Sequence, residues 1–111
     1  MASSEKVLIR DLNKEPEYQR LLAGKPETCG MRSGRVYLEA GKDCGEHSTK
    51  DHEELLVFLT GEGELQIGDS GRFAVGAGRV AYIPPQTVHN VRNPGTEPLA
   101  YIYCVAPASD S

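Results

Sequence analysis

The sequence predicts an all-β domain, a sandwich or barrel of about eight or nine short strands. Twelve glycines and seven prolines are spread through the 111 residues and separate short apolar runs, as in all-β proteins with many turns. These runs recur at the regular short spacing that is typical of sandwiches and barrels. A chain of this length forms one domain around one core. We therefore predict a single domain over residues 1–111.

The N-terminal third contains two predicted strands and at most one short helix. VLIR at 7–10 is a short strand candidate, and KEPEYQRLL at 14–22 is a brief helix candidate with Pro16 in its first turn. RVYLEA at 35–40 alternates in the way of a half-buried strand. Its two faces carry Val36, Leu38 and Ala40 on one side and Arg35, Tyr37 and Glu39 on the other.

The central and C-terminal parts supply the remaining strands. ELLVFLT at 54–60 is apolar on both faces, and GELQIGD at 63–69 follows a GEG turn, which predicts a hairpin between the two. Four further strands are predicted at 72–75, 79–85, 88–93 and 99–107.

The strand at 54–60 raises the question of what covers its second face. If Leu56 and Phe58 face the core, the alternate positions would be polar in a sheet with one wet face, yet Leu55, Val57 and Leu59 occupy them. Either a second copy of the chain covers that face, which predicts a homodimer, or the N-terminal segment does.

Composition excludes several classes of function. The net charge is −4 and the lysines and arginines are scattered, so no basic face for nucleic acid or an anionic membrane is expected. No apolar stretch approaches the ~20 residues of a membrane span, and the first residues lack the apolar core of a secretory signal. The three cysteines (Cys29, Cys44 and Cys104) are widely spaced and odd in number. They indicate reduced thiols and a cytoplasmic protein.

The histidines suggest a metal site. His47, His52 and His89 all fall near predicted strand ends, and imidazole is the commonest metal ligand. His47 shares a face with Thr49, and His52 shares a face with Glu54, but the two pairs are out of phase. A bulge or loop at Lys50 and Asp51 restores agreement, so that all of these side chains face inward. The alternative for His52 is an exposed loop residue beside Asp51.

Two spaced motifs resemble those of the cupins, the germin-like superfamily of conserved β-barrels. The first motif, G-x5-H-x-H-x(3,4)-E-x6-G, corresponds to residues 41–61, with Gly41, His47, Thr49, Glu54 and Gly61 at its fixed positions. The second, G-x5-P-x-G-x2-H-x3-N, corresponds to residues 78–93, with Gly78, Pro84, Gln86, His89 and Asn93. Every spacing is preserved. Thr49 stands in place of a histidine and Gln86 in place of a turn glycine.

The resemblance implies a double-stranded β-helix, the jelly-roll barrel of cupins, with His47, Glu54 and His89 in the metal-ligand positions. Two imidazoles and one carboxylate form the ligand set of the facial triad of non-haem iron oxygenases. Thr49 removes a fourth ligand, which His52 could replace if it turns inward. Zinc, nickel, iron, manganese and copper all accept nitrogen and oxygen ligands.

Two functions are consistent with this site. One is a metal-dependent dioxygenase, isomerase or lyase acting on a small molecule, in which Glu54 is the ligand most able to act as a base. The other is a non-catalytic module that binds a small ligand in the same pocket, with a weak or absent metal. Expected pocket or second-shell residues are Thr49, Tyr37, Phe58, Tyr82, Tyr101 and Tyr103.

Overall fold

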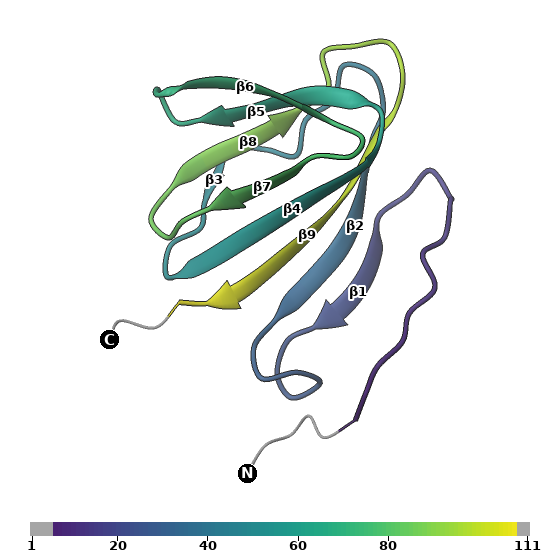
Figure 1. Ribbon diagram of the computed structural model, residues 1–111, viewed down its shortest axis with the longest axis vertical. Helices are drawn as coiled ribbons and strands as arrows, with labels where there is room; N and C mark the ends of the chain where they lie inside the picture. The colour runs from purple at the N-terminus through teal and green to yellow at the C-terminus, as the bar shows by residue number, and fades with distance from the viewer. Residues whose placement is uncertain (1–5, 109–111) are drawn as a thin grey trace.

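Nine strands in two facing sheets make up the protein in the computed structural model, which describes residues 6–108 (Figure 1). The strands are β1 (Gln19–Ala23), β2 (Arg32–Leu38), β3 (His47–Ser48), β4 (His52–Thr60), β5 (Glu62–Ile67), β6 (Gly71–Gly76), β7 (Val80–Ile83), β8 (Val88–Arg92) and β9 (Leu99–Pro107). One sheet has the order β1-β2-β9-β4-β7 and the other β3-β8-β5-β6, and every strand pair is antiparallel. The predicted all-β double-stranded β-helix is confirmed. Residues 6–108 contain no helix that could span a membrane.

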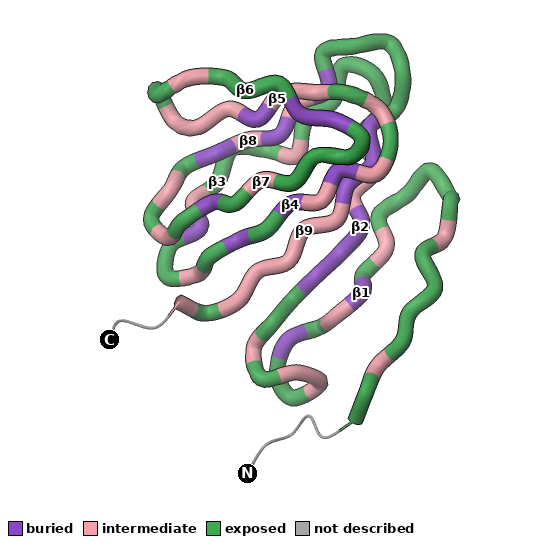
Figure 2. The backbone as a smooth tube through the Cα atoms, viewed as in Figure 1, coloured by how far each residue is buried: buried purple, intermediate pink, exposed green. Residues whose placement is uncertain are grey.

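The core lies between the inner faces of the two sheets, and buried positions alternate with less buried ones most clearly along β4 (Figure 2). In β4, the side chains of Glu54, Leu56 and Phe58 are buried, whereas those of Glu53 and Leu55 are exposed. A period of two residues is what a strand with one buried face requires. The core consists of Leu38, Leu56, Phe58, Leu65, Val75, Ile83, Val91, Leu99 and Tyr101.

The predictions for the N-terminal region were wrong in two places. Residues 19–22 of the predicted helix instead lie in β1, which pairs with β2 and buries Leu21. A nine-residue helix is marginal by itself, whereas the edge of β2 supplies backbone partners. Residues 7–10, predicted as a strand, form none, and Val7 and Ile9 are 89% and 83% exposed.

The predicted hairpin around Gly61 is also absent. β4 pairs with β7 and β9, whereas β5 pairs with β6 and β8, so the chain crosses from one sheet to the other at Gly61. Gly61 has φ +83°, and a Cβ there would collide with the backbone of Pro98 and Leu99. Glycine permits this crossing because it lacks the Cβ that makes positive φ unfavourable.

The N-terminal segment covers part of the outer face of the larger sheet. The buried guanidinium of Arg35 donates hydrogen bonds to Asn13 Oδ1 and to the carbonyls of Glu15 and Glu17. At the other end of that face, Leu55, Val80 and Tyr82 are 41%, 67% and 60% exposed. Of the two coverings considered for this face, a second copy of the chain or the N-terminal segment, the N-terminal segment therefore accounts for one part of it.

Candidate metal centre

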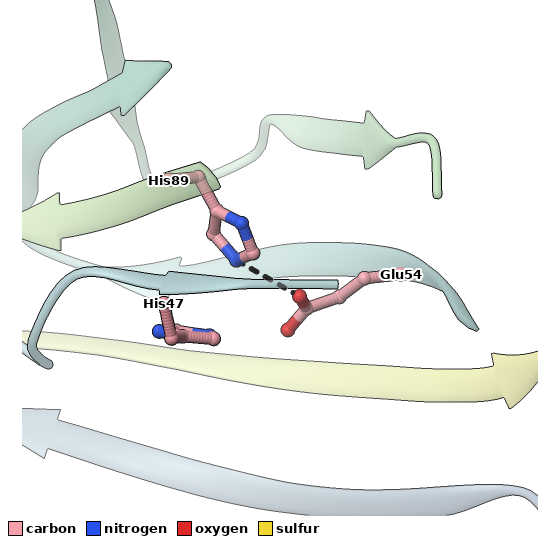
Figure 3. A group of neighbouring side chains, drawn as sticks. All are labelled: His47, Glu54 and His89. Atoms are coloured by element: carbon pink, nitrogen blue, oxygen red, sulfur yellow. Dashed lines mark ion pairs between the residues drawn. The ribbon is translucent and has the colours of Figure 1, made fainter. Parts of the chain in front are cut away.

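Three side chains from both sheets meet between the sheets (Figure 3). His47 of β3 lies directly opposite His89 of β8, and the two ring centroids are 4.3 Å apart. Glu54 comes from β4 in the facing sheet. The ligand atoms of these three residues all lie within 4.8 Å of one another. The structure thus brings together the His–Glu–His set that the resemblance to the cupin motifs implied.

A tight turn corrects the phase between the two halves of the first motif. The amide of His52 donates to the carbonyl of Thr49 at 3.0 Å, and Lys50 within this turn has φ +55°. The chain reverses here from β3 in one sheet to β4 in the other. The bulge or loop predicted at Lys50 and Asp51 is therefore present as a tight turn.

Both histidine rings of the cluster are fixed by main-chain carbonyls. His47 Nδ1 lies 2.8 Å from the carbonyl oxygen of Gly45, and His89 Nδ1 lies 3.1 Å from that of Thr87. A carbonyl oxygen only accepts hydrogen bonds, so each Nδ1 carries the proton. In a neutral ring this leaves the lone pair on Nε2, which is the arrangement that hydrogen-bond partners give to metal-binding histidines.

The closest contact in the cluster joins His89 and Glu54, which are 1% and 7% exposed. His89 Nε2 lies 3.0 Å from Glu54 Oε1. Burial by itself lowers the pKa of His89, but the hydrogen bonds to Glu54 and Thr87 and the charge of Glu54 together outweigh burial and raise it. Because a neutral His89 protonated on Nδ1 has only a lone pair at Nε2, the pair must share either a second proton or a cation.

The cluster lies on a cavity of about 250 Å3 between the sheets. Its interior wall is mainly apolar and includes Val36, Leu56 and Val91 together with Tyr101 and Tyr103. Burial is the main cause that raises the pKa of both tyrosines above the ordinary value, so both phenols are neutral hydrogen-bonding groups. Tyr101 and Tyr103, two of the expected pocket residues, thus line this cavity.

His52 lines the mouth of the same cavity but does not join the metal group. Its Nδ1 lies 2.9 Å from the exposed carboxylate of Asp51. In this structure His52 is therefore not the additional metal ligand that we predicted, because the tight turn places it beside its own neighbour at the mouth.

Thr49 lines the cavity, but its hydroxyl forms hydrogen bonds with backbone groups. Thr49 Oγ1 donates to the carbonyl of Pro84 at 2.7 Å and accepts from the amide of Thr87 at 3.0 Å. The only hydroxyl proton is thus used on Pro84. Thr49 therefore stabilises the turn before His89.

Three predicted pocket residues lie elsewhere. Tyr37 is on the outer face, with the Arg35 guanidinium 5.9 Å from its ring centroid. Phe58 is buried in the core against Tyr101, at 5.2 Å between ring centroids. Tyr82 is exposed on the outer face and donates to Glu53 Oε1 at 2.9 Å, a bond that raises its pKa. The sequence pattern did not show which face of each strand points into the cavity, nor how far along the strand the cavity extends.

The sequence analysis missed Arg32, Cys44 and Ser48, which also line the cavity. Arg32 is in phase with Val36 and Leu38, which face inward, so the alternation of β2 contained a signal for it. The predicted strand began only at residue 35. Cys44 Sγ accepts from the amide of Val91 at 3.3 Å, a contact that no sequence spacing indicates.

Two facing antiparallel sheets with a His–Glu–His group in the cavity between them define a small β-barrel protein with a possible metal site. The chain belongs to the Cupin domain family, whose sequence profile matches residues 34–105. This match includes both of the spaced motifs, at 41–61 and 78–93.

The chain is also similar in sequence or in fold to several known proteins. The chain is 36% identical over 61 residues to an uncharacterised protein of Methanocaldococcus jannaschii, covering 55% of this chain and 48% of that protein. It therefore spans about half the length of this curated relative. A cupin 2 conserved barrel domain protein from Salinispora arenicola is 27% identical, with a TM-score of 0.74 and coverage of 94% and 92% of the two chains. A Bacillus halodurans protein, BH2720, has a TM-score of 0.78 at 21% identity, with coverage of 97% and 88%.

Proposed function

We propose that the protein binds one divalent transition metal ion through His47, Glu54 and His89 and acts on a small molecule in the adjoining cavity. The observation that carries this proposal is the convergence of the three ligand atoms within 4.8 Å. The donor set fits such an ion, since imidazole nitrogen and carboxylate oxygen suit zinc, nickel, iron, manganese and copper. The shared-proton contact between His89 and Glu54 also marks a place where a cation is favourable.

The chain's own residues would position the reaction. A metal bound here would supply a Lewis acid that polarises an oxygen of the substrate. The carbonyls of Gly45 and Thr87 keep both imidazoles in the ligating tautomer. Glu54 is the one carboxylate among the cavity-lining residues of the described chain, and we propose that it accepts the proton removed from the substrate.

A second candidate, a non-catalytic module that binds a small ligand without metal, is favoured by one observation. His89 and Glu54 already satisfy each other at 3.0 Å, so the cavity is stable without an ion. Thr49, at a position where cupin motifs have a histidine, is committed to Pro84 and Thr87. The two candidates differ in metal content.

Elemental analysis of untagged protein grown in metal-replete medium distinguishes them. We expect about one equivalent of a transition metal per chain in the wild type and loss of most of it in His47→Ala. His47 is exposed, so its truncation leaves the core intact. The matched control is His52→Ala, which removes a cavity histidine outside the group and should keep the metal. Less than about a tenth of an equivalent in the wild type would refute the metalloprotein and favour the metal-free module.

A further inference from the structure

Arg32 lies in the same row of the larger sheet as Glu54. Arg32 of β2 pairs with Val105 of β9, and Val105 pairs in turn with Glu54 of β4. Adjacent strands are about 4.8 Å apart, so the Cα atoms of Arg32 and Glu54 are roughly 10 Å apart on the inner face. Both side chains line the metal cavity, Glu54 in its interior and Arg32 at its exposed mouth.

The charge of Arg32 is not neutralised within residues 6–108. Arg10 and Arg92 form ion pairs with Glu27 and Glu64, but Arg32 takes part in no ion pair or side-chain hydrogen bond of this part of the chain. The one acidic side chain among the described lining residues, Glu54, is already paired with His89. The mouth of the cavity therefore presents an unmatched guanidinium.

The charge of Arg32 also acts inside the cavity. Burial raises the pKa of Tyr103, and the positive charge of Arg32 opposes this effect by lowering it. His52 and Ser48 line the same mouth and add polar groups beside Arg32. Deeper in the cavity, Val36, Leu56 and Val91 offer an apolar wall.

We propose that the ligand of this cavity is a small organic anion whose carboxylate binds Arg32 while its body reaches toward His47, Glu54 and His89. For the reactive centre, this inference rests on the proposed function. A guanidinium is suited to the task because its planar fork of donors matches a carboxylate in two parallel hydrogen bonds. A cavity of about 250 Å3 has the volume of roughly eight water molecules, so the anion must be small.

Titration with benzoate and with its neutral analogue benzamide tests the proposal. Binding is followed by calorimetry or NMR shifts, both for protein freed of metal by chelation and for protein loaded with zinc. In the wild type we expect benzoate to bind at least about tenfold more tightly than benzamide, since hydrogen bonds to charged groups are the stronger kind. Arg32→Gln should abolish this preference, and Arg32→Lys should retain part of it. The matched control is Arg72→Gln, an exposed arginine of β6 that does not line this cavity.

The outcomes separate this proposal from the metal site. A benzoate preference that depends on Arg32 in a protein that takes up no zinc and contains no other transition metal by elemental analysis supports the anion site and refutes the metalloprotein. Zinc uptake with equal binding of benzoate and benzamide, or with a preference that persists in Arg32→Gln, overturns the anion site and leaves the metal function intact. Wild-type benzoate binding weaker than about 10 mM in both states also overturns it.

Discussion

His89 Nε2 and Glu54 Oε1 lie 3.0 Å apart and join the two sheets of the barrel through one buried contact. His89 belongs to β8 in the four-stranded sheet and Glu54 to β4 in the five-stranded sheet. The contact holds a proton in the metal-free protein, and the proposed metal would take the place of that proton. Both metal affinity and the stability of the fold are therefore expected to depend on pH through this proton.

Metal affinity should increase with pH through the neutral range. The pKa of His89 is raised above its ordinary value of 6.5, so a proton competes with the metal at Nε2 up to a pH above 6.5. We expect zinc affinity to fall about tenfold per pH unit below the raised pKa and to level off above it. Calorimetry in buffers of different ionisation enthalpy should show about one proton released per zinc bound near neutral pH. Affinity that is constant between pH 6 and pH 8 would contradict the shared proton.

The stability of the metal-free protein should have the opposite pH dependence. A histidine whose pKa is higher in the folded state stabilises the fold fully below its unfolded pKa of about 6.5. This contribution is lost as the pH rises through the folded pKa. We therefore expect the free energy of unfolding, measured with urea and chelator, to decrease over that interval in the wild type.

The variant His89→Gln provides the control for this measurement, because it cannot take up the proton. Its unfolding free energy should show a smaller change over the same interval. An equal change in both proteins would assign the pH dependence to other groups.

Thr49→Val should destabilise the turn before His89 by about 1–3 kcal/mol. The substitution preserves the shape but removes the hydroxyl that bonds to Pro84 and Thr87, so that two backbone groups lose their partner. Thr49→Ser retains the hydroxyl and should cost less. Urea denaturation of the metal-free proteins measures both.

Thr49→His should raise metal affinity while lowering stability. Position 49 lies on the same inner face as His47 and lines the cavity, so a histidine there adds an imidazole to the site. The same change removes the two hydrogen bonds of the threonine hydroxyl. Unchanged zinc affinity in a folded Thr49→His protein would show that a side chain at this position does not reach the metal.

Arg35→Met should release the N-terminal segment from the outer face of the sheet. The buried guanidinium bonds to Asn13, Glu15 and Glu17, and hydrogen bonds of this kind contribute about 1–3 kcal/mol. We expect faster hydrogen exchange at residues 13–19 and little change in β4 or β9. Arg20→Met, on the neighbouring strand and exposed, is the control.

We propose that a second copy of the chain covers the exposed apolar part of that outer face. Leu55, Val80 and Tyr82 lie side by side on β4 and β7 and leave an apolar surface beyond the N-terminal segment. Sedimentation at micromolar concentration should give twice the 12.1 kDa of one chain. Val80→Lys should shift the protein to the monomer, whereas Val88→Lys, an exposed valine on the opposite sheet, should not. A monomeric wild type would contradict the dimer.

The strands from β4 to β9 were predictable because apolar runs and turn residues are local features of the sequence. Apolar runs between turn residues identified β4, although both of its faces are apolar in the sequence, and the resemblance to the cupin motifs implied His47, Glu54 and His89. The phase conflict between His47 and Glu54 also predicted the turn at Lys50 and Asp51. The strands and this turn require knowledge only of residues close together in the chain, whereas the ligand set also required the resemblance to a known family.

The tertiary structure decided which strands are neighbours and therefore which side chains share the cavity. Only the crossing at Gly61 separates β4 from β5, and only the register of β2 with β9 brings Arg32 into the row of Glu54. The hydrogen-bond partners of the Thr49 hydroxyl, Pro84 and Thr87, likewise lie more than thirty residues away in the sequence. The physical reason is that strand pairing joins residues far apart in sequence through backbone hydrogen bonds, which are the same for every residue type except proline.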